Sequence, residues 1–228
     1  MKRLLLLTLL VGSTAVFSQS NPELLKHFEA YYKEMKLRGD AQGAINGLTH
    51  LDVLEPSQAK KDTLAYLYLS EGLNLQALNT IGIEKNATDS NIAVEVKALA
   101  LKALGDPKRA IEHFEVMFSR KPNALIAYEL ADLKTQSSDF AGAKTHIEYG
   151  LANARDDQMR GFFEMQSPYQ VPVKAAFLFL KGLITFNEDE VKNKDAALAL
   201  LDQALQIEPN FNMANLSKEA IMAKKPQE

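Results

Sequence analysis

Residues 98–114 of the chain read ALALKALGDPKRAIEHF. Apolar residues recur at helical spacing on both sides of Gly105-Asp106, a pair that favours a turn followed by the start of a new helix. The segment therefore predicts two helices joined by a short turn, with Ala98 on the first helix and Ala110 on the second. Such a pair forms an antiparallel helix hairpin.

The same arrangement recurs with a period of 33 residues. The alanines and the turn residues that precede them by five positions are Ala44, Ala77, Ala110 and Ala143, and Gly39, Gly72, Gly105 and Ser138. A regular period of this size indicates stacked structural units. Each hairpin alone leaves an apolar face exposed, and stacking buries that face. Ala197, which lies 54 residues after Ala143, marks a further unit after an interruption.

The repeated pattern resembles the tetratricopeptide repeat family, whose helix–turn–helix unit has about 34 residues. The segments that carry the resemblance best are Phe28…Tyr32…Gly39-Asp40…Ala44…Leu48…Pro56 and Ala98…Gly105-Asp106…Ala110-Ile111…Phe114…Pro122. Ankyrin repeats have a similar period, but their Thr-Pro-Leu-His signature does not occur in this sequence. The resemblance implies an all-α solenoid of antiparallel helix hairpins. Its expected parts are repeats at 22–56, 58–89, 91–122, 124–156 and 174–209, and a capping helix at 211–223.

Residues 154–173 interrupt the period. This insert contains an apolar set that a solvated linker would not need: Met159, Phe162, Phe163, Met165 and Tyr169. Two interpretations remain open, an extension of the fourth hairpin that packs on its own stack and a flap that shapes a groove. No strands are expected, because sustained alternation bounded by hairpin turns is absent.

Residues 1–18 have the features of a signal peptide. Lys2 and Arg3 precede an apolar run over 4–11, and small residues follow. A membrane anchor is the alternative, but the run is short for a span of ~20 residues. We therefore expect cleavage before Gln19, a mature domain of 19–228, export to the periplasm or the exterior, and no transmembrane span after cleavage.

Composition and motifs argue against several functions. The formal net charge of −3 gives no reason to expect nucleic acid as a partner, and the absence of cysteine excludes thiolate chemistry. No phosphate-binding loop, dinucleotide fingerprint or hydrolase motif occurs, so we expect neither enzyme activity nor a cofactor. His113 and His146 lie 33 residues apart, but no third metal ligand is apparent. We expect them to be exposed or half-buried surface residues.

The family resemblance implies that the first helix of each hairpin lines a concave groove that holds peptides or partner helices. By position, the groove would include Lys33, Tyr66, Leu69, Leu99, Lys102, Tyr128, Asp132 and Phe179. We expect a non-enzymatic scaffold of the cell envelope that binds a protein or peptide. Two alternatives remain: a protein that binds or acts on a small ligand such as a glycan, with 154–173 as its lid, and self-association through terminal hairpins.

Overall fold

The computed structural model describes residues 21–224; the expected signal peptide, 1–18, lies outside this range. In chain order, the helices and strands are α2 (Asn21–Arg38), α3 (Ala41–Leu54), α4 (Gln58–Ser70), α5 (Asn74–Ile81), α6 (Asn91–Ala103), α7 (Pro107–Arg120), α8 (Ala124–Gln136), α9 (Phe140–Asn153), β1 (Met159–Phe162), β2 (Tyr169–Pro172), α10 (Val173–Glu188), α11 (Lys194–Ile207) and α12 (Asn212–Ala223). The fold is the predicted all-α solenoid.

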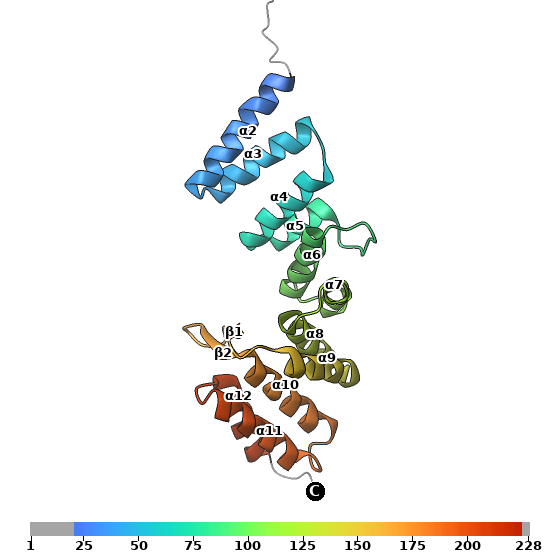
Figure 1. Ribbon diagram of the computed structural model, residues 1–228, viewed down its shortest axis with the longest axis vertical. Helices are drawn as coiled ribbons and strands as arrows, with labels where there is room; N and C mark the ends of the chain where they lie inside the picture. The colour runs from blue at the N-terminus through green and yellow to red at the C-terminus, as the bar shows by residue number, and fades with distance from the viewer. Residues whose placement is uncertain (1–20, 225–228) are drawn as a thin grey trace, which may run out of the picture.

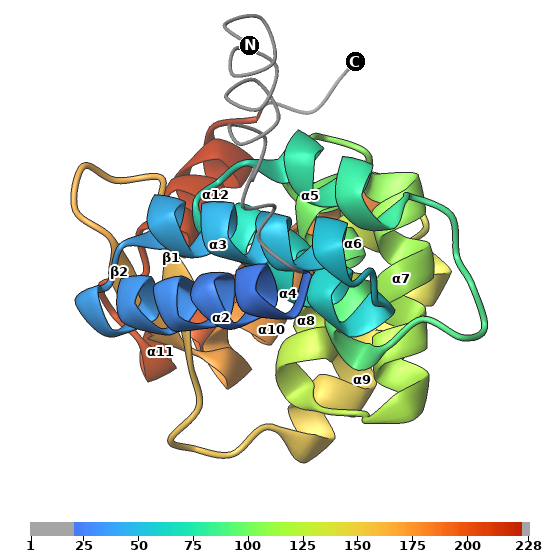
Figure 2. The same cartoon turned by 90° about the horizontal axis from the view of Figure 1, so that it is seen from above.

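The helices form hairpins that stack along the long axis in the order of the sequence (Figure 1). The partners within each hairpin are α2–α3, α4–α5, α6–α7, α8–α9 and α10–α11, and α12 packs on α11. Viewed from above, successive hairpins lie over one another with a rotation between them (Figure 2). The second helix of each hairpin contacts the first helix of the next, so neighbouring hairpins pack on one another along the stack.

The glycine before each second helix has a conformational role. Gly39, Gly72 and Gly105 have φ values of 69°, 72° and 74°, and Ser138 takes the same place at 60°. This left-handed conformation ends a helix and reverses the chain, and glycine adopts it without steric cost. The aspartate that follows three of these residues then caps the next helix. For example, the Asp40 carboxylate accepts a hydrogen bond from the Gly43 amide at 2.8 Å.

The alanine series lies where the two helices of each hairpin cross. Ala77, Ala110, Ala143 and Ala197 are 0% exposed and Ala44 is 2% exposed. In the last hairpin, Gly182 takes part in the crossing: a Cβ atom there would lie 3.3 Å from the Ala197 carbonyl oxygen. Small residues therefore set the close approach of the helices.

The buried core is unevenly distributed along the stack. The largest cluster lies in the C-terminal half and extends from Ala124 on α8 to Ile221 on α12. The first hairpin contributes a much smaller cluster, formed by Ile45, Leu48 and Leu51 with Leu64 of α4. No residue of α2 is fully buried. The N-terminal end therefore contributes least to the core.

The second hairpin is the irregular one. Helix α5 has only 8 residues and ends at Ile81, because Gly82 has a φ of 77°. A loop over 82–90 then leads to α6. Lys97 of α6 binds this loop through two hydrogen bonds. Its ammonium lies 2.7 Å from Asp89 Oδ2 and 2.8 Å from the Glu84 carbonyl oxygen.

The expectation that the chain has no strands was wrong. Strands β1 and β2 form an antiparallel hairpin between α9 and α10, with Arg160 paired to Val171 and Phe162 paired to Tyr169. Because side chains alternate across a strand, these four residues share one face of the hairpin. That face is turned toward the solenoid: Val171 is 0% exposed, and the other three are half-buried.

Candidate functional site

The first helices carry equivalent residues at intervals of one repeat. Lys33, Tyr66, Leu99 and Asp132 follow one another at 33-residue spacing on α2, α4, α6 and α8. We call the surface formed by these helices and α10 the first-helix face. Of the predicted groove residues, Lys33 is exposed, Tyr66 is 50% exposed, and Leu69, Leu99, Lys102 and Asp132 are half-buried.

Two of the predicted groove residues are not available to a partner. Tyr128 is 2% exposed and Phe179 is 3% exposed, so their inclusion in an open groove was wrong. Both lie on the C-terminal part of the first-helix face, on α8 and α10. The physical reason is different for each: Arg160 of the insert lies over the Tyr128 ring, and Phe211, just before α12, lies against Phe179.

Arg160 of β1 fastens the hairpin to α8. Its guanidinium carbon lies 4.0 Å from the centre of the Tyr128 ring, and its Nη1 donates to Glu129 Oε1 at 2.5 Å. Lys102 of α6 donates to the other oxygen of Glu129. One carboxylate therefore joins the insert, α8 and α6.

The charges in this cluster stabilise one another. Burial alone would raise the pKa of Glu129, but Arg160 and Lys102 outweigh it and hold the pKa below its ordinary value. Burial likewise opposes the charge of Arg160, and Glu129 restores it, so that the pKa of Arg160 is raised. Burial raises the pKa of Tyr128, which therefore stays neutral. The cluster is a structural contact in which one carboxylate pairs with two cations.

A second set of contacts fastens the hairpin to the C-terminal helix. The Phe162 ring lies 4.8 Å from that of Phe211, which itself lies 5.1 Å from Phe179. The Tyr169 hydroxyl donates to Glu164 Oε1 and accepts from the Met213 amide. Aromatic rings therefore occupy the space beneath Phe162, where the lid interpretation would require a ligand.

The hairpin also exposes apolar side chains, on β1 at Met159 and in the turn between the strands at Phe163 and Met165. Met159, Phe163 and Met165 are 40%, 76% and 48% exposed. The prediction that the insert packs on the solenoid is therefore correct for Phe162 and Tyr169 only. Arg160 was missed, although a cation directly beside the apolar residues Met159, Phe162 and Phe163 is a signal that could have indicated it.

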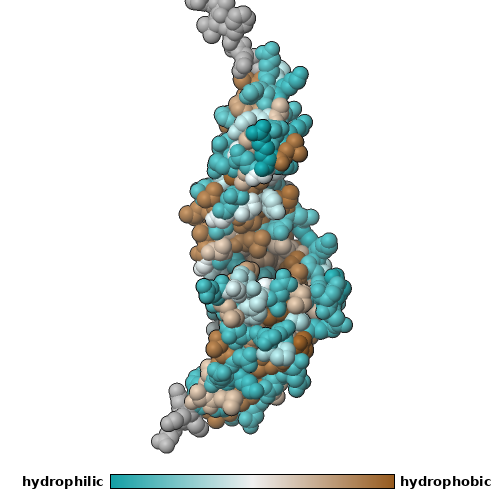
Figure 3. All heavy atoms as spheres, turned by 90° about the vertical axis from the view of Figure 1, so that its left-hand side faces the viewer, coloured by the Kyte–Doolittle hydropathy of each residue, from teal (hydrophilic) through white to brown (hydrophobic). Residues whose placement is uncertain are grey.

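The N-terminal part of the first-helix face remains uncovered by the hairpin. On the side toward which the hairpin projects, hydrophobic surface gathers near the middle of the molecule (Figure 3). Tyr66 of α4 is an exposed apolar residue of this part of the face, whereas Leu75, which is also exposed, lies on the second helix α5. Lys33 has no ion-pair partner among residues 21–224.

The two histidines of the sequence analysis do not lie on the surface. His113 is 1% exposed and His146 is 6% exposed, which corrects the expectation of surface positions. His113 Nε2 lies 3.0 Å from the Ile83 carbonyl oxygen, whereas His146 lies near Glu115 and Lys134. Burial lowers the pKa of both. Within residues 21–224, no three His, Asp or Glu side chains gather in a way that could hold a metal ion.

Among the described helices, none combines the length and apolar character that crossing a membrane would require. This finding applies to residues 21–224 only.

Comparison with known proteins supports the fold. The structure of YrrB, described as a TPR protein with an unusual peptide-binding site, matches with a TM-score of 0.65 at 13% identity, over 84% of this chain and 90% of that one. The structure of MamA matches with a TM-score of 0.61 at 15% identity, over 91% and 100%. No protein-family model and no curated protein matches the sequence. The chain therefore has the tetratricopeptide repeat fold.

Proposed function

We propose that this protein is a non-catalytic scaffold that binds a polypeptide on the N-terminal part of the first-helix face, formed by α2, α4 and α6. The observation that carries the proposal is the division of this face. Its own hairpin covers α8 and α10, whereas α2, α4 and α6 present exposed Tyr66, half-buried Leu69 and Leu99, and unpaired Lys33. An aromatic residue beside apolar and cationic side chains suits recognition of a polypeptide.

The similarity of fold to YrrB, described as having a peptide-binding site, is consistent with this proposal. We further propose that the protein acts in the cell envelope, on the basis of the basic and apolar pattern over 1–18. N-terminal sequencing of the mature protein tests this part. A chain that retains Met1 after expression in its own host would contradict it.

Affinity capture from an envelope extract tests the binding surface. We expect Tyr66→Ala to weaken capture of the partner about tenfold or more while helicity stays unchanged, because aromatic anchors contribute most to such interfaces. Val53→Ala is the matched control, since Val53 is 74% exposed on α3, a second helix.

Equal capture by the wild type and Tyr66→Ala would place the partner elsewhere and refute the proposal. Recovery of untagged copies of the same chain alone would indicate self-association instead.

A further inference from the structure

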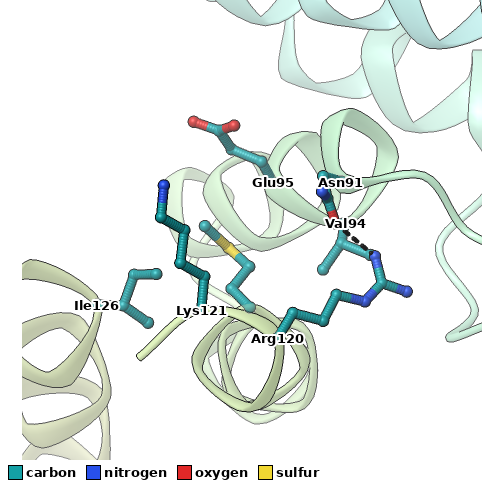
Figure 4. Close-up of a pocket in the computed structure, with 7 residues that line it drawn as sticks. Asn91, Val94, Glu95, Arg120, Lys121 and Ile126 are labelled. Carbon is teal, nitrogen blue, oxygen red and sulfur yellow. Dashed lines mark hydrogen bonds between the residues drawn. The ribbon is translucent and has the colours of Figure 1, made fainter. Parts of the chain in front are cut away.

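A cavity of about 310 Å³ lies at the junction of α6, α7 and α8 (Figure 4). It exists because α6 and α8 do not pack closely, although α4 packs on α6 and α8 packs on α10. Its apolar lining comes from Val94, Met117 and Ile126. Ligand pockets range from about 300 to 1,000 Å³, so this volume suits one large side chain better than a cofactor.

The next junction shows what fills the corresponding space. One repeat after Met117 comes Gly150, and one repeat after Glu95 comes Tyr128. The Phe177 ring of α10 covers Gly150 so closely that a Cβ atom there would lie 1.9 Å from Phe177 Cζ. The same ring lies 5.4 Å from Tyr128, edge to face. The space between α8, α9 and α10 is therefore filled by an aromatic ring, whereas the cavity one repeat earlier is open.

The rim of the open cavity carries two cations that have no carboxylate partner among the described residues. Arg120 bonds only to neutral Asn91, with Nη1 3.0 Å from Oδ1, and Lys121 has no ion pair within residues 21–224. Figure 4 shows Lys121 and Glu95 on one side of the cavity, and the Arg120–Asn91 pair on the other. Since Glu95 is the single carboxylate among the lining residues, the rim has a net positive charge.

We infer that this cavity binds an aromatic side chain of a partner polypeptide that has acidic residues on both sides of it. The ring would lie on Val94, Met117 and Ile126, and the flanking carboxylates would reach Arg120 and Lys121. An internal segment fits better than a chain terminus, because the two cations lie on opposite sides of the cavity. The inference rests on the proposed polypeptide binding and specifies the chemistry of the partner.

Blocked peptides, acetylated and amidated, test the inference. We expect Glu-Asp-Phe-Asp-Glu to bind saturably to the purified protein and to shift the NMR methyl signals of Met117 and Ile126. Two control peptides should bind at least tenfold more weakly. The peptide with Ala in place of Phe lacks the apolar contact of the ring, and Lys-Lys-Phe-Lys-Lys lacks the ionic contacts of the acidic residues. Equal binding of the basic peptide would overturn the inference.

Variants assign the site. Lys121→Glu should weaken the acidic peptide about tenfold, and Lys108→Glu, an exposed position at the other end of α7, should leave its binding unchanged. Ile126→Phe should close the cavity as Phe177 does at the next junction, and circular dichroism checks its folding. Because Lys121 is exposed, its variant keeps the test valid if Ile126→Phe fails to fold. Binding that neither variant weakens would refute the site.

The two proposals can fail separately. If Tyr66→Ala abolishes capture of the natural partner but the acidic peptide does not bind, the cavity inference fails and the first-helix face stands. If the peptide binds at Met117 and Ile126 while Tyr66→Ala captures normally, the cavity stands and the proposed surface fails.

Discussion

At the scale of single residues, one position shows how a repeat core accommodates a charge. Lys97 lies one repeat after Leu64 and one repeat before Leu130, both core leucines. Its side chain is 0% exposed, and it pairs with Asp89, whose side chain is 11% exposed. The lysine at this position joins the loop that follows the short helix α5 to α6, which a leucine could not do.

Burial would raise the pKa of Asp89, but the hydrogen bonds from Lys97 and Asn86 and the Lys97 charge hold it below the ordinary value of 3.8. A carboxyl whose pKa is lower in the folded state stabilises the fold above the pKa of the unfolded chain. That stability is lost as the pH falls through the folded pKa. The contribution of Asp89 should therefore be complete at neutral pH and decline below about pH 4.

We expect Lys97→Met to lower the free energy of unfolding by about 3 kcal/mol at pH 7, because it leaves a largely buried carboxylate without its cation. Urea unfolding at pH 7 and at the lowest pH where the protein stays folded measures the effect, and the loss should shrink as Asp89 becomes protonated. Lys60→Met is the control, since its partner Glu55 is 70% exposed and such pairs contribute about 0–1 kcal/mol. Equal losses of unfolding free energy in both variants would show that the Lys97–Asp89 pair stabilises the fold no more than an exposed ion pair does.

At the scale of elements, the helix boundaries could be predicted because their signals are local. The left-handed glycine, the capping aspartate and the small residue at each crossing all act within one hairpin, so the period shows them directly. The β-hairpin could not be predicted in the same way. Its strands have four residues each, and its inward face mixes Arg160 with aromatic and aliphatic residues. What orders it is the contact with Tyr128, Glu129 and Phe211, which are distant in sequence.

The burial of Tyr128 and Phe179 also depends on residues distant in sequence, since Arg160 lies over Tyr128 and Phe211 lies against Phe179. Position within a repeat identifies which residues belong to the first-helix face, and both of these residues do belong to it. It cannot show which part of that face is covered by a segment from outside the repeat pattern. Lys33, Tyr66, Leu69 and Leu99 lie where no such segment packs, and their role in binding stays a prediction.

We expect Arg160→Ala to loosen the hairpin while the helices remain folded. Glu129 would lose one of its two cations and the Tyr128 ring would be uncovered, at a cost of about 1–3 kcal/mol. Hydrogen exchange of the amides in 159–162 and 169–172 should become faster. Arg155→Ala is the control, because it removes the ion pair with Asp157, whose side chains are 70% and 74% exposed. It should change neither the free energy of unfolding nor the exchange rate of the hairpin amides. Unchanged exchange in Arg160→Ala would mean that the aromatic contacts alone hold the hairpin.

At the scale of the whole molecule, the stack has an asymmetry in stability. Each hairpin contacts only its neighbours, so local losses do not have to spread along a solenoid. The C-terminal half combines its large core with the hairpin and α12, whereas α2 has no fully buried residue. The proposed binding surface therefore begins at the less stable end, where elements that adapt to partners are commonly found.

This asymmetry predicts that the protein does not unfold in a single step. Amide exchange should be fastest in α2 and α3 and slowest in α8 to α11.

Leu48→Ala and Leu201→Ala each remove a buried leucine from the equivalent position of the first and last hairpins, and each should cost about 2–5 kcal/mol locally. Leu48→Ala should speed exchange in α2 to α4 only, because the C-terminal core does not depend on the first hairpin. Leu201→Ala should instead lower the midpoint of the main urea transition. Equal acceleration of exchange throughout residues 21–224 in both variants would contradict this prediction, because the stack would then unfold as a single cooperative unit. In that case, a partner bound at α2, α4 and α6 would stabilise α8 to α11 as well.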